Sequence, residues 1–164
     1  MEHSFIISLD SKRLQIFNEI FKQNNLNSDS VYVLDGFKFT KNLPYNSHHK
    51  NIVQSIPDFS LNSIGCAASH RAIIQMAKYL DWPFVCIFED DAYPCKDIVN
   101  KLNHYLSKIP EECDCLLLGS YQYQAEKYDD DFLKVYNDIT KYAGGHSYII
   151  FKKAYDRYIE IFNN

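Results

Sequence analysis

The sequence predicts an α/β fold in which a mainly parallel sheet is flanked by helices. Short apolar runs rich in β-branched and aromatic residues alternate with longer amphipathic segments along the 164 residues. Uninterrupted apolar runs are typical of strands that are buried on both faces. Residues 5–34 follow the order strand, helix, strand, which is the pattern of a βαβ unit.

The N-terminal elements follow from local patterns. Residues 5–9 form a short apolar strand, and Asp10 or Ser11 can cap the helix that follows. Apolar residues recur at helical spacing over residues 14–21. Residues 31–34 have the composition of a second strand. These elements together form the predicted βαβ unit.

Residues 38–60 show no regular period. They contain prolines, asparagines and the adjacent His48 and His49, so we expect a long surface loop. The two histidines can be read as a metal-binding pair or as two solvated side chains. Neighbouring side chains on a loop seldom converge on one ion, which favours the second interpretation.

A long amphipathic helix is predicted next, with apolar residues from Ile64 to Leu80. Small residues near its start would let the helix pack closely on the sheet. Ser69 and His70 lie near this predicted start, where free backbone amides and the helix dipole favour an anion.

The following strand, at residues 84–88, ends in Glu89, Asp90 and Asp91. Adjacent carboxylates repel one another and lose hydration at the end of a buried strand, so they destabilise the fold unless a cation or hydrogen-bond donors lie among them. A hard divalent metal ion would meet that need. The alternative is a solvated acidic turn before the next helix, and the pattern leaves both interpretations open.

The C-terminal half continues the alternation. A helix at residues 98–109 ends at Pro110, and residues 115–118 form a buried strand. Residues 121–141 are rich in tyrosine and aspartate, so they could bind an acceptor or form a solvated loop around a short strand at residues 132–136. The last elements are a strand within residues 143–151, preceded by two glycines, and a helix over residues 154–162.

Composition restricts the class of protein. The chain is 46% hydrophobic and 15% aromatic, which predicts a packed core, and its net charge of -4 gives no indication of nucleic-acid binding. No apolar run reaches the about 20 residues of a membrane span. The cysteines are odd in number and lack zinc-type CxxC pairs, so we expect reduced core thiols in a cytoplasmic protein; they are Cys66, Cys86, Cys95, Cys113 and Cys115.

Two motifs carry a resemblance to a known family. Residues 61–70 contain Ile-Gly-Cys-x-x-Ser-His, and residues 87–92 contain Glu-Asp-Asp about twenty residues later. Together they resemble the central signature of glycosyltransferase family 25, the lipopolysaccharide and collagen galactosyltransferase-like family. Further segments agree in the right order; they are residues 6–10, 34–36, 117–119 and 145–150.

The resemblance implies a GT-A type, Rossmann-like fold formed by residues 1–164 as a single domain, shortened at the C-terminus relative to family members. It also implies a UDP-sugar donor, most often UDP-galactose, a Mn²⁺ or Mg²⁺ cofactor, and transfer with inversion to a saccharide or glycolipid acceptor of lipopolysaccharide type. We expect a cytoplasmic enzyme without a transmembrane segment, with peripheral membrane association left open. The alternative is a shortened, non-catalytic module that binds a nucleotide sugar or another protein.

The resemblance also assigns roles to residues, with Glu89-Asp90-Asp91 as the DxD-like motif. Asp91 is the expected metal ligand, together with Glu89. The sequence does not identify the general base; the candidates are His146, which could instead be a metal ligand, Asp130 and Asp131. For Asp10, Arg13 and Asp35 the cap and turn roles remain open alternatives. The full nucleotide-sugar set is Asp10, Arg13, Asp35, Ser69, His70, Glu89 and Asp90.

Overall fold

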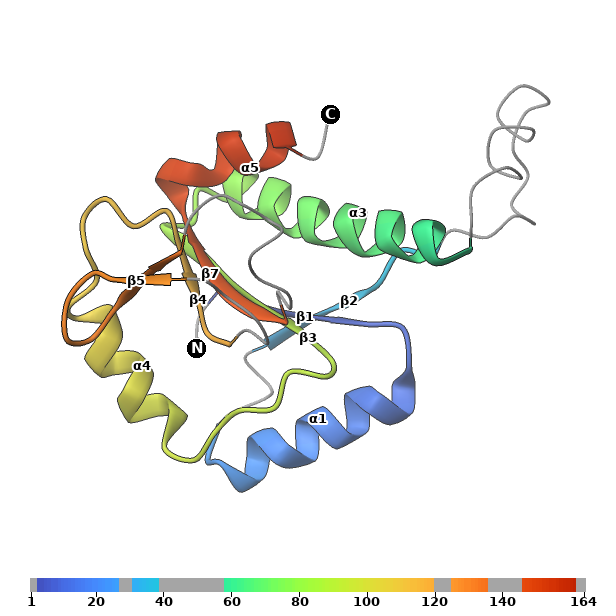
Figure 1. Ribbon diagram of the computed structural model, residues 1–164. Helices are drawn as coiled ribbons and strands as arrows, with labels where there is room; N and C mark the ends of the chain where they lie inside the picture. Colours follow the sequence, from blue (N-terminus) through green and yellow to red (C-terminus); the bar gives the residue numbers. More distant parts are fainter. Residues whose placement is uncertain (1–2, 27–30, 39–57, 120–124, 136–145, 162–164) are drawn as a thin grey trace.

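A computed structural model describes residues 3–26, 31–38, 58–119, 125–135 and 146–161 (Figure 1). Several features singled out in the sequence lie outside these residues. They are His48 and His49, most of the predicted loop over residues 38–60, the tyrosines at positions 121, 123 and 136, and the two glycines at positions 144 and 145.

A five-stranded mixed sheet forms the centre of the fold, with the order β2-β1-β3-β7-β4. β1 pairs in parallel with β2 and β3, whereas β7 lies antiparallel between β3 and β4. The predicted α/β class with a mainly parallel sheet is therefore confirmed, and β7 is the antiparallel strand in it. The strands are β1 (Ser4–Ser8), β2 (Val31–Asp35), β3 (Phe84–Glu89), β4 (Cys115–Leu117) and β7 (Ser147–Phe151).

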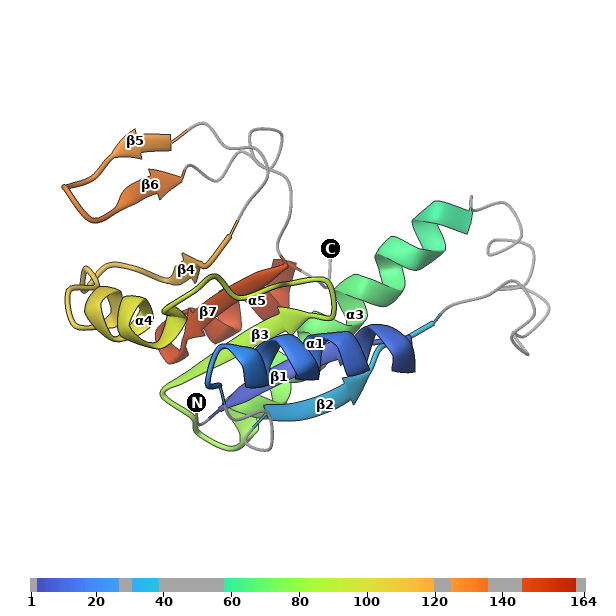
Figure 2. The same ribbon diagram turned by 90° about the horizontal axis from the view of Figure 1, so that it is seen from below.

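Helices cover both faces of the sheet (Figures 1 and 2). Helices α3 (Asp58–Tyr79) and α5 (Tyr155–Ile161) lie on one face, and α5 follows the short 3-10 helix η2 (Lys152–Ala154). Helices α1 (Ser11–Gln23) and α4 (Ile98–Leu106) lie on the other. None of the described helices combines the length and the apolar composition that a membrane span requires.

The side chains of β3 alternate between two apolar clusters. Val85 and Ile87 belong to the cluster under α3 and α5, and Cys86 and Phe88 belong to the cluster under α1. This alternation follows from the strand period of two residues. It also determines where the acidic end of the strand points, because Glu89 continues the α3 side and Asp90 continues the α1 side.

The structure differs from the predicted elements at two places. Helix α3 begins at Asp58, not near Ile64, so Ser69 and His70 lie in the middle of a 22-residue helix and not at a free N-terminus. The hairpin of β5 (Ala125–Lys127) and β6 (Leu133–Val135) adds a strand, β5, that the sequence did not indicate. A three-residue polar strand has too few apolar positions to show a period.

The cysteines are only partly core residues. All five are described and free, and Cys86 is buried as expected. Cys66 and Cys95 are exposed, so the expectation of core thiols was wrong for these two. Cys113 and Cys115 are half-buried, and the Cys113 thiol donates to the backbone carbonyl of Cys115.

Asp10 caps helix α1, which gives a first testable prediction. Its Oδ1 accepts hydrogen bonds from the backbone amides of Lys12 and Arg13, at 2.8 and 3.4 Å. We expect Asp10→Ala to lower the free energy of unfolding by about 1 kcal/mol, measured by urea denaturation. Asp10→Asn keeps a capping oxygen and is the matched control. Equal stability of both variants would contradict the capping role.

Candidate functional site

The carboxyl ends of three parallel strands and the start of β7 lie at one edge of the sheet. β1, β2 and β3 run in parallel, so their carboxyl ends at Ser8, Asp35 and Glu89 lie side by side. β7 runs in the opposite direction, so its first residues lie at this edge too, and the Glu89 amide donates to the His146 carbonyl at 2.7 Å. Ligands of open α/β sheets bind at the carboxyl ends of parallel strands.

Glu89, Asp91 and His146 form a compact group at this edge. His146 Nδ1 lies 3.0 Å from Asp91 Oδ1 and 3.7 Å from Glu89 Oε2. One ligand atom from each of the three residues lies within 4.8 Å of the others. Two carboxylates and one imidazole are suitable ligands for a first-row divalent ion such as Mn²⁺. The group is partly exposed, so a ligand can reach it from solvent.

Asp90 points away from this group and is buried. Its Oδ2 accepts a hydrogen bond from Ser8 Oγ at 2.7 Å, and its Oδ1 lies 2.8 Å from an Arg13 guanidinium nitrogen. The same nitrogen lies 3.0 Å from Asp91 Oδ2. Asp90 thus links β1, α1 and the end of β3, and Arg13 offsets the charge of two of the three acids.

Helix α3 presents Cys66 and His70 to the other side of Glu89. His70 Nε2 lies 3.3 Å from Glu89 Oε1, and the Cys66 Sγ lies 3.9 Å from the same oxygen. His70 Nδ1 lies 2.5 Å from the hydroxyl of Tyr148 in β7. His70 and Tyr148 are both buried.

Two pKa shifts describe this part of the site. Partial burial and the negative charge of Glu89 raise the pKa of Cys66 to about 11, so the thiol keeps its proton at neutral pH. Burial raises the pKa of Tyr148 well above its usual value, so its hydroxyl is neutral. Cys66 is therefore not an activated nucleophile.

Ser69 serves the fold. It is buried, its Oγ donates to the Gly65 carbonyl at 2.8 Å, and the same Oγ accepts from the Phe37 amide at 2.8 Å. These bonds join the segment after β2 to helix α3. Asp35 is exposed at the end of β2, and Asp10 is exposed at the start of α1.

The family model for "Glycosyltransferase family 25 (LPS biosynthesis protein)" matches residues 1–164, which is the whole chain. The chain belongs to glycosyltransferase family 25. This membership places the protein among the glycosyltransferases, in a family associated with lipopolysaccharide biosynthesis. Comparison with curated proteins found no match.

In this family 25 protein, Asp130 and Asp131 lie apart from the cluster of Glu89, Asp91 and His146. Asp131 accepts hydrogen bonds from Lys108 Nζ at 2.6 Å and His104 Nε2 at 3.1 Å, and these bonds lower its pKa. Asp130 is paired with Lys127 at 2.6 Å. Their hairpin lies beside α4, away from the end of β3 (Figures 1 and 2). The structure therefore brings His146, but not Asp130 or Asp131, to the acidic end of β3.

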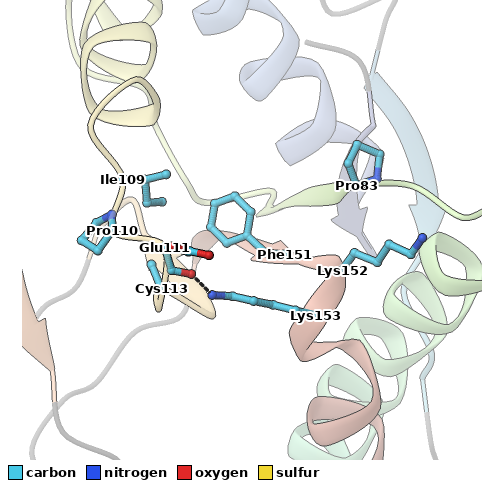
Figure 3. A pocket seen from close by; sticks show the side chains of 8 residues that line it. All are labelled: Pro83, Ile109, Pro110, Glu111, Cys113, Phe151, Lys152 and Lys153. Carbon is cyan, nitrogen blue, oxygen red and sulfur yellow. Dashed lines mark hydrogen bonds between the residues drawn. The ribbon is translucent and has the colours of Figure 1, made fainter.

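A cavity of about 290 Å³ lies at the other end of β3, where Pro83 leads into the strand and Phe151 ends β7 (Figure 3). The Lys153 amine there already donates to the Glu111 carbonyl. This cavity is separate from the cluster of Glu89, Asp91 and His146 at the family 25 site. Its lining is Pro83, Ile109, Pro110, Glu111, Cys113, Phe151, Lys152 and Lys153.

Three contact residues of the family 25 site were not predicted as site residues; they are Cys66, Ser8 and Tyr148. Ser8 is a polar residue at the end of an apolar strand, and it shares the face of Ile6, which is the face that Asp90 continues. Tyr148 lies on the α3 side of β7. Strand alternation indicates these faces, but the partner of each side chain depends on strand order, which the sequence does not contain.

Proposed function

We propose that this family 25 glycosyltransferase is metal-dependent and transfers a hexose from a UDP-sugar to a saccharide acceptor of lipopolysaccharide type. In this proposal the hexose is galactose, and the transfer inverts the configuration at its anomeric carbon. Family membership supports the general activity. The observation that supports metal dependence is the convergence of Glu89, Asp91 and His146, which come from two antiparallel strand ends.

The donor atoms fit a divalent ion. Glu89 Oε2, Asp91 Oδ1 and His146 Nδ1 would hold Mn²⁺ or Mg²⁺, and the imidazole nitrogen favours Mn²⁺ because Mg²⁺ prefers oxygen ligands. When bound, the ion supplies positive charge that stabilises a departing diphosphate. In this proposal His146 is a ligand, and it is therefore not available as the general base.

Arg13 and Asp90 position the acidic end of β3. Arg13 contacts both Asp90 and Asp91, so it keeps Asp91 directed toward His146 and places a cation at the edge where the diphosphate would lie. Asp90 is buried, so we assign it a supporting role through Ser8 and Arg13 and not a direct contact with the donor.

The exposed acids at the neighbouring strand ends are the candidates for nucleotide binding. Asp10 follows β1 and Asp35 ends β2, and both offer carboxylate oxygens to ribose hydroxyls at the edge where open α/β sheets bind ligands. Ser69 and His70 are buried in hydrogen bonds to protein groups, so we assign them to support of this edge.

Calorimetry tests the donor site. We expect UDP to bind in the presence of Mn²⁺ and binding to be lost when a chelator removes the ion, because the diphosphate contacts depend on the metal charge. UDP binding that is unchanged by the chelator would contradict metal dependence. Incubation with UDP-galactose and lipooligosaccharide acceptors then separates the two function classes, since UDP binding without transfer or donor hydrolysis indicates the non-catalytic module.

A further inference from the structure

A second group of metal-ligating atoms lies beside the first. Cys66 Sγ, His70 Nε2 and Glu89 Oε1 all lie within 4.8 Å of one another. The distances from Glu89 Oε1 are 3.3 Å to His70 and 3.9 Å to Cys66. Four ligands arranged tetrahedrally at Zn²⁺ bond lengths of about 2.0–2.3 Å are about 3.3–3.8 Å apart. The two distances from Glu89 Oε1 are thus close to the spacing of a coordinated set.

The fold builds this group from regular elements. Cys66 and His70 are four residues apart on α3, so they lie on one face of the helix. That face continues as Ile73, Ile74 and Ala77, which are buried against the sheet. Glu89 follows Ile87 on the α3 side of β3, so strand alternation directs it toward the two helix residues.

The chemistry of the set is that of a soft or borderline metal ion. Zn²⁺ binds a cysteine sulfur and an imidazole nitrogen more strongly than Mg²⁺ or Mn²⁺ does. One thiolate and one carboxylate balance the charge of a divalent ion. His70 also has a supporting partner, because the Tyr148 hydroxyl lies 2.5 Å from its Nδ1 and can accept a hydrogen bond from Nδ1–H, which leaves Nε2 free to bind metal.

We propose that Cys66, His70 and Glu89 form a binding site for a thiophilic divalent ion such as Zn²⁺, with a fourth position open to solvent or a ligand. Binding displaces the thiol proton of Cys66 to solvent and forms a metal–sulfur bond, with no change in oxidation state. This site shares Glu89 with the group of Glu89, Asp91 and His146, but its other two ligands, Cys66 and His70, come from helix α3.

The two sites share Glu89 but use different oxygens. Oε1 faces Cys66 and His70, and Oε2 faces His146. An ion bound by Cys66 and His70 therefore fixes the orientation of the Glu89 carboxylate, which we also assign as a ligand of the metal that binds the UDP-sugar donor. The proposal does not depend on the proposed transferase activity, because its ligands and its measurement differ from those of the donor site.

Cobalt is the probe for this site, because Co²⁺ bound to a thiolate gives a ligand-to-metal charge-transfer absorption that oxygen and nitrogen ligands do not give. We expect titration of the full chain with Co²⁺ to produce this band, and Zn²⁺ to remove it by displacement. Cys66→Ser should abolish the band and weaken Zn²⁺ binding more than about 10-fold. Cys95→Ser, which changes another exposed thiol, is the matched control and should keep the band.

Asp91→Asn separates this site from the donor site. It removes a ligand of the proposed donor metal and should leave the cobalt–thiolate band intact. Loss of the band in Asp91→Asn, persistence of the band in Cys66→Ser, or no band in the unaltered protein would each overturn the proposal. If the band is present but UDP binding does not depend on Mn²⁺, only the proposed metal site of Glu89, Asp91 and His146 is refuted.

Thiol labelling provides a measurement that needs no variant. We expect Zn²⁺ to slow maleimide modification of Cys66 at least about 10-fold, because coordination blocks the sulfur. Modification of Cys95 in the same sample should not change, and peptide mass spectrometry distinguishes the two positions. Equal labelling rates of Cys66 with and without Zn²⁺ would overturn the proposal.

Discussion

Asp91→Asn is expected to lower kcat for sugar transfer at least about 100-fold and to abolish the dependence of UDP binding on Mn²⁺. The amide keeps the size of the side chain but removes the charge that, with Glu89 and His146, would hold the ion. Asp91 is partly exposed and Asp90 retains its own contacts with Ser8 and Arg13, so the fold should remain intact. Calorimetry with UDP and Mn²⁺ and a transfer assay with UDP-galactose measure the effect.

The control for this prediction is Asp130→Asn. Asp130 is another aspartate of the chain, but its side chain is 95% exposed and is paired with Lys127 in the β5–β6 hairpin. We expect kcat and UDP binding to change less than about twofold, since this surface position lies outside the proposed site. A loss of activity equal to that of Asp91→Asn would indicate that the hairpin carries the catalytic chemistry.

Phe17→Ala is expected to lower the free energy of unfolding by about 3–5 kcal/mol, measured by urea denaturation. Phe17 is fully buried on the sheet-facing side of α1, its ring stacks on Phe21 at a centroid distance of 4.0 Å, and it packs against Phe88 of β3 at 6.0 Å. Its removal leaves a cavity between the helix and the strand that ends in the acidic residues. A loss of this size is a large part of the stability of a typical domain.

Ile16→Ala is the matched control on the same helix. Its side chain is 46% exposed, so the change should cost less than about 1 kcal/mol. If both variants lost the same stability, the burial of Phe17 in the core would not explain the effect of Phe17→Ala, because alanine has a higher helix propensity than either phenylalanine or isoleucine. Because Arg13 lies one turn before Phe17, loosening α1 should also weaken Mn²⁺-dependent UDP binding.

Strand and helix positions were predictable where apolar residues have a clear period. The strand at residues 84–88 and the helix that contains Phe17 and Phe21 agree with β3 and α1. The prediction failed for the start of α3, because residues 58–63 carry few apolar side chains, and for β5, because its three residues are mostly polar. Short or polar elements are stabilised by their neighbours and not by a pattern of their own.

The sequence by itself determined the α/β class, the family signature and the acidic end of a buried strand, because each depends on residues close together in the chain. Only the tertiary structure decided which side chains meet those acids. The insertion of β7 antiparallel beside β3 brings His146 to Asp91, and the packing of α3 on the sheet brings Cys66 and His70 to Glu89. These contacts join residues that are far apart in sequence, so they depend on strand order and helix packing, which no local pattern of residues specifies.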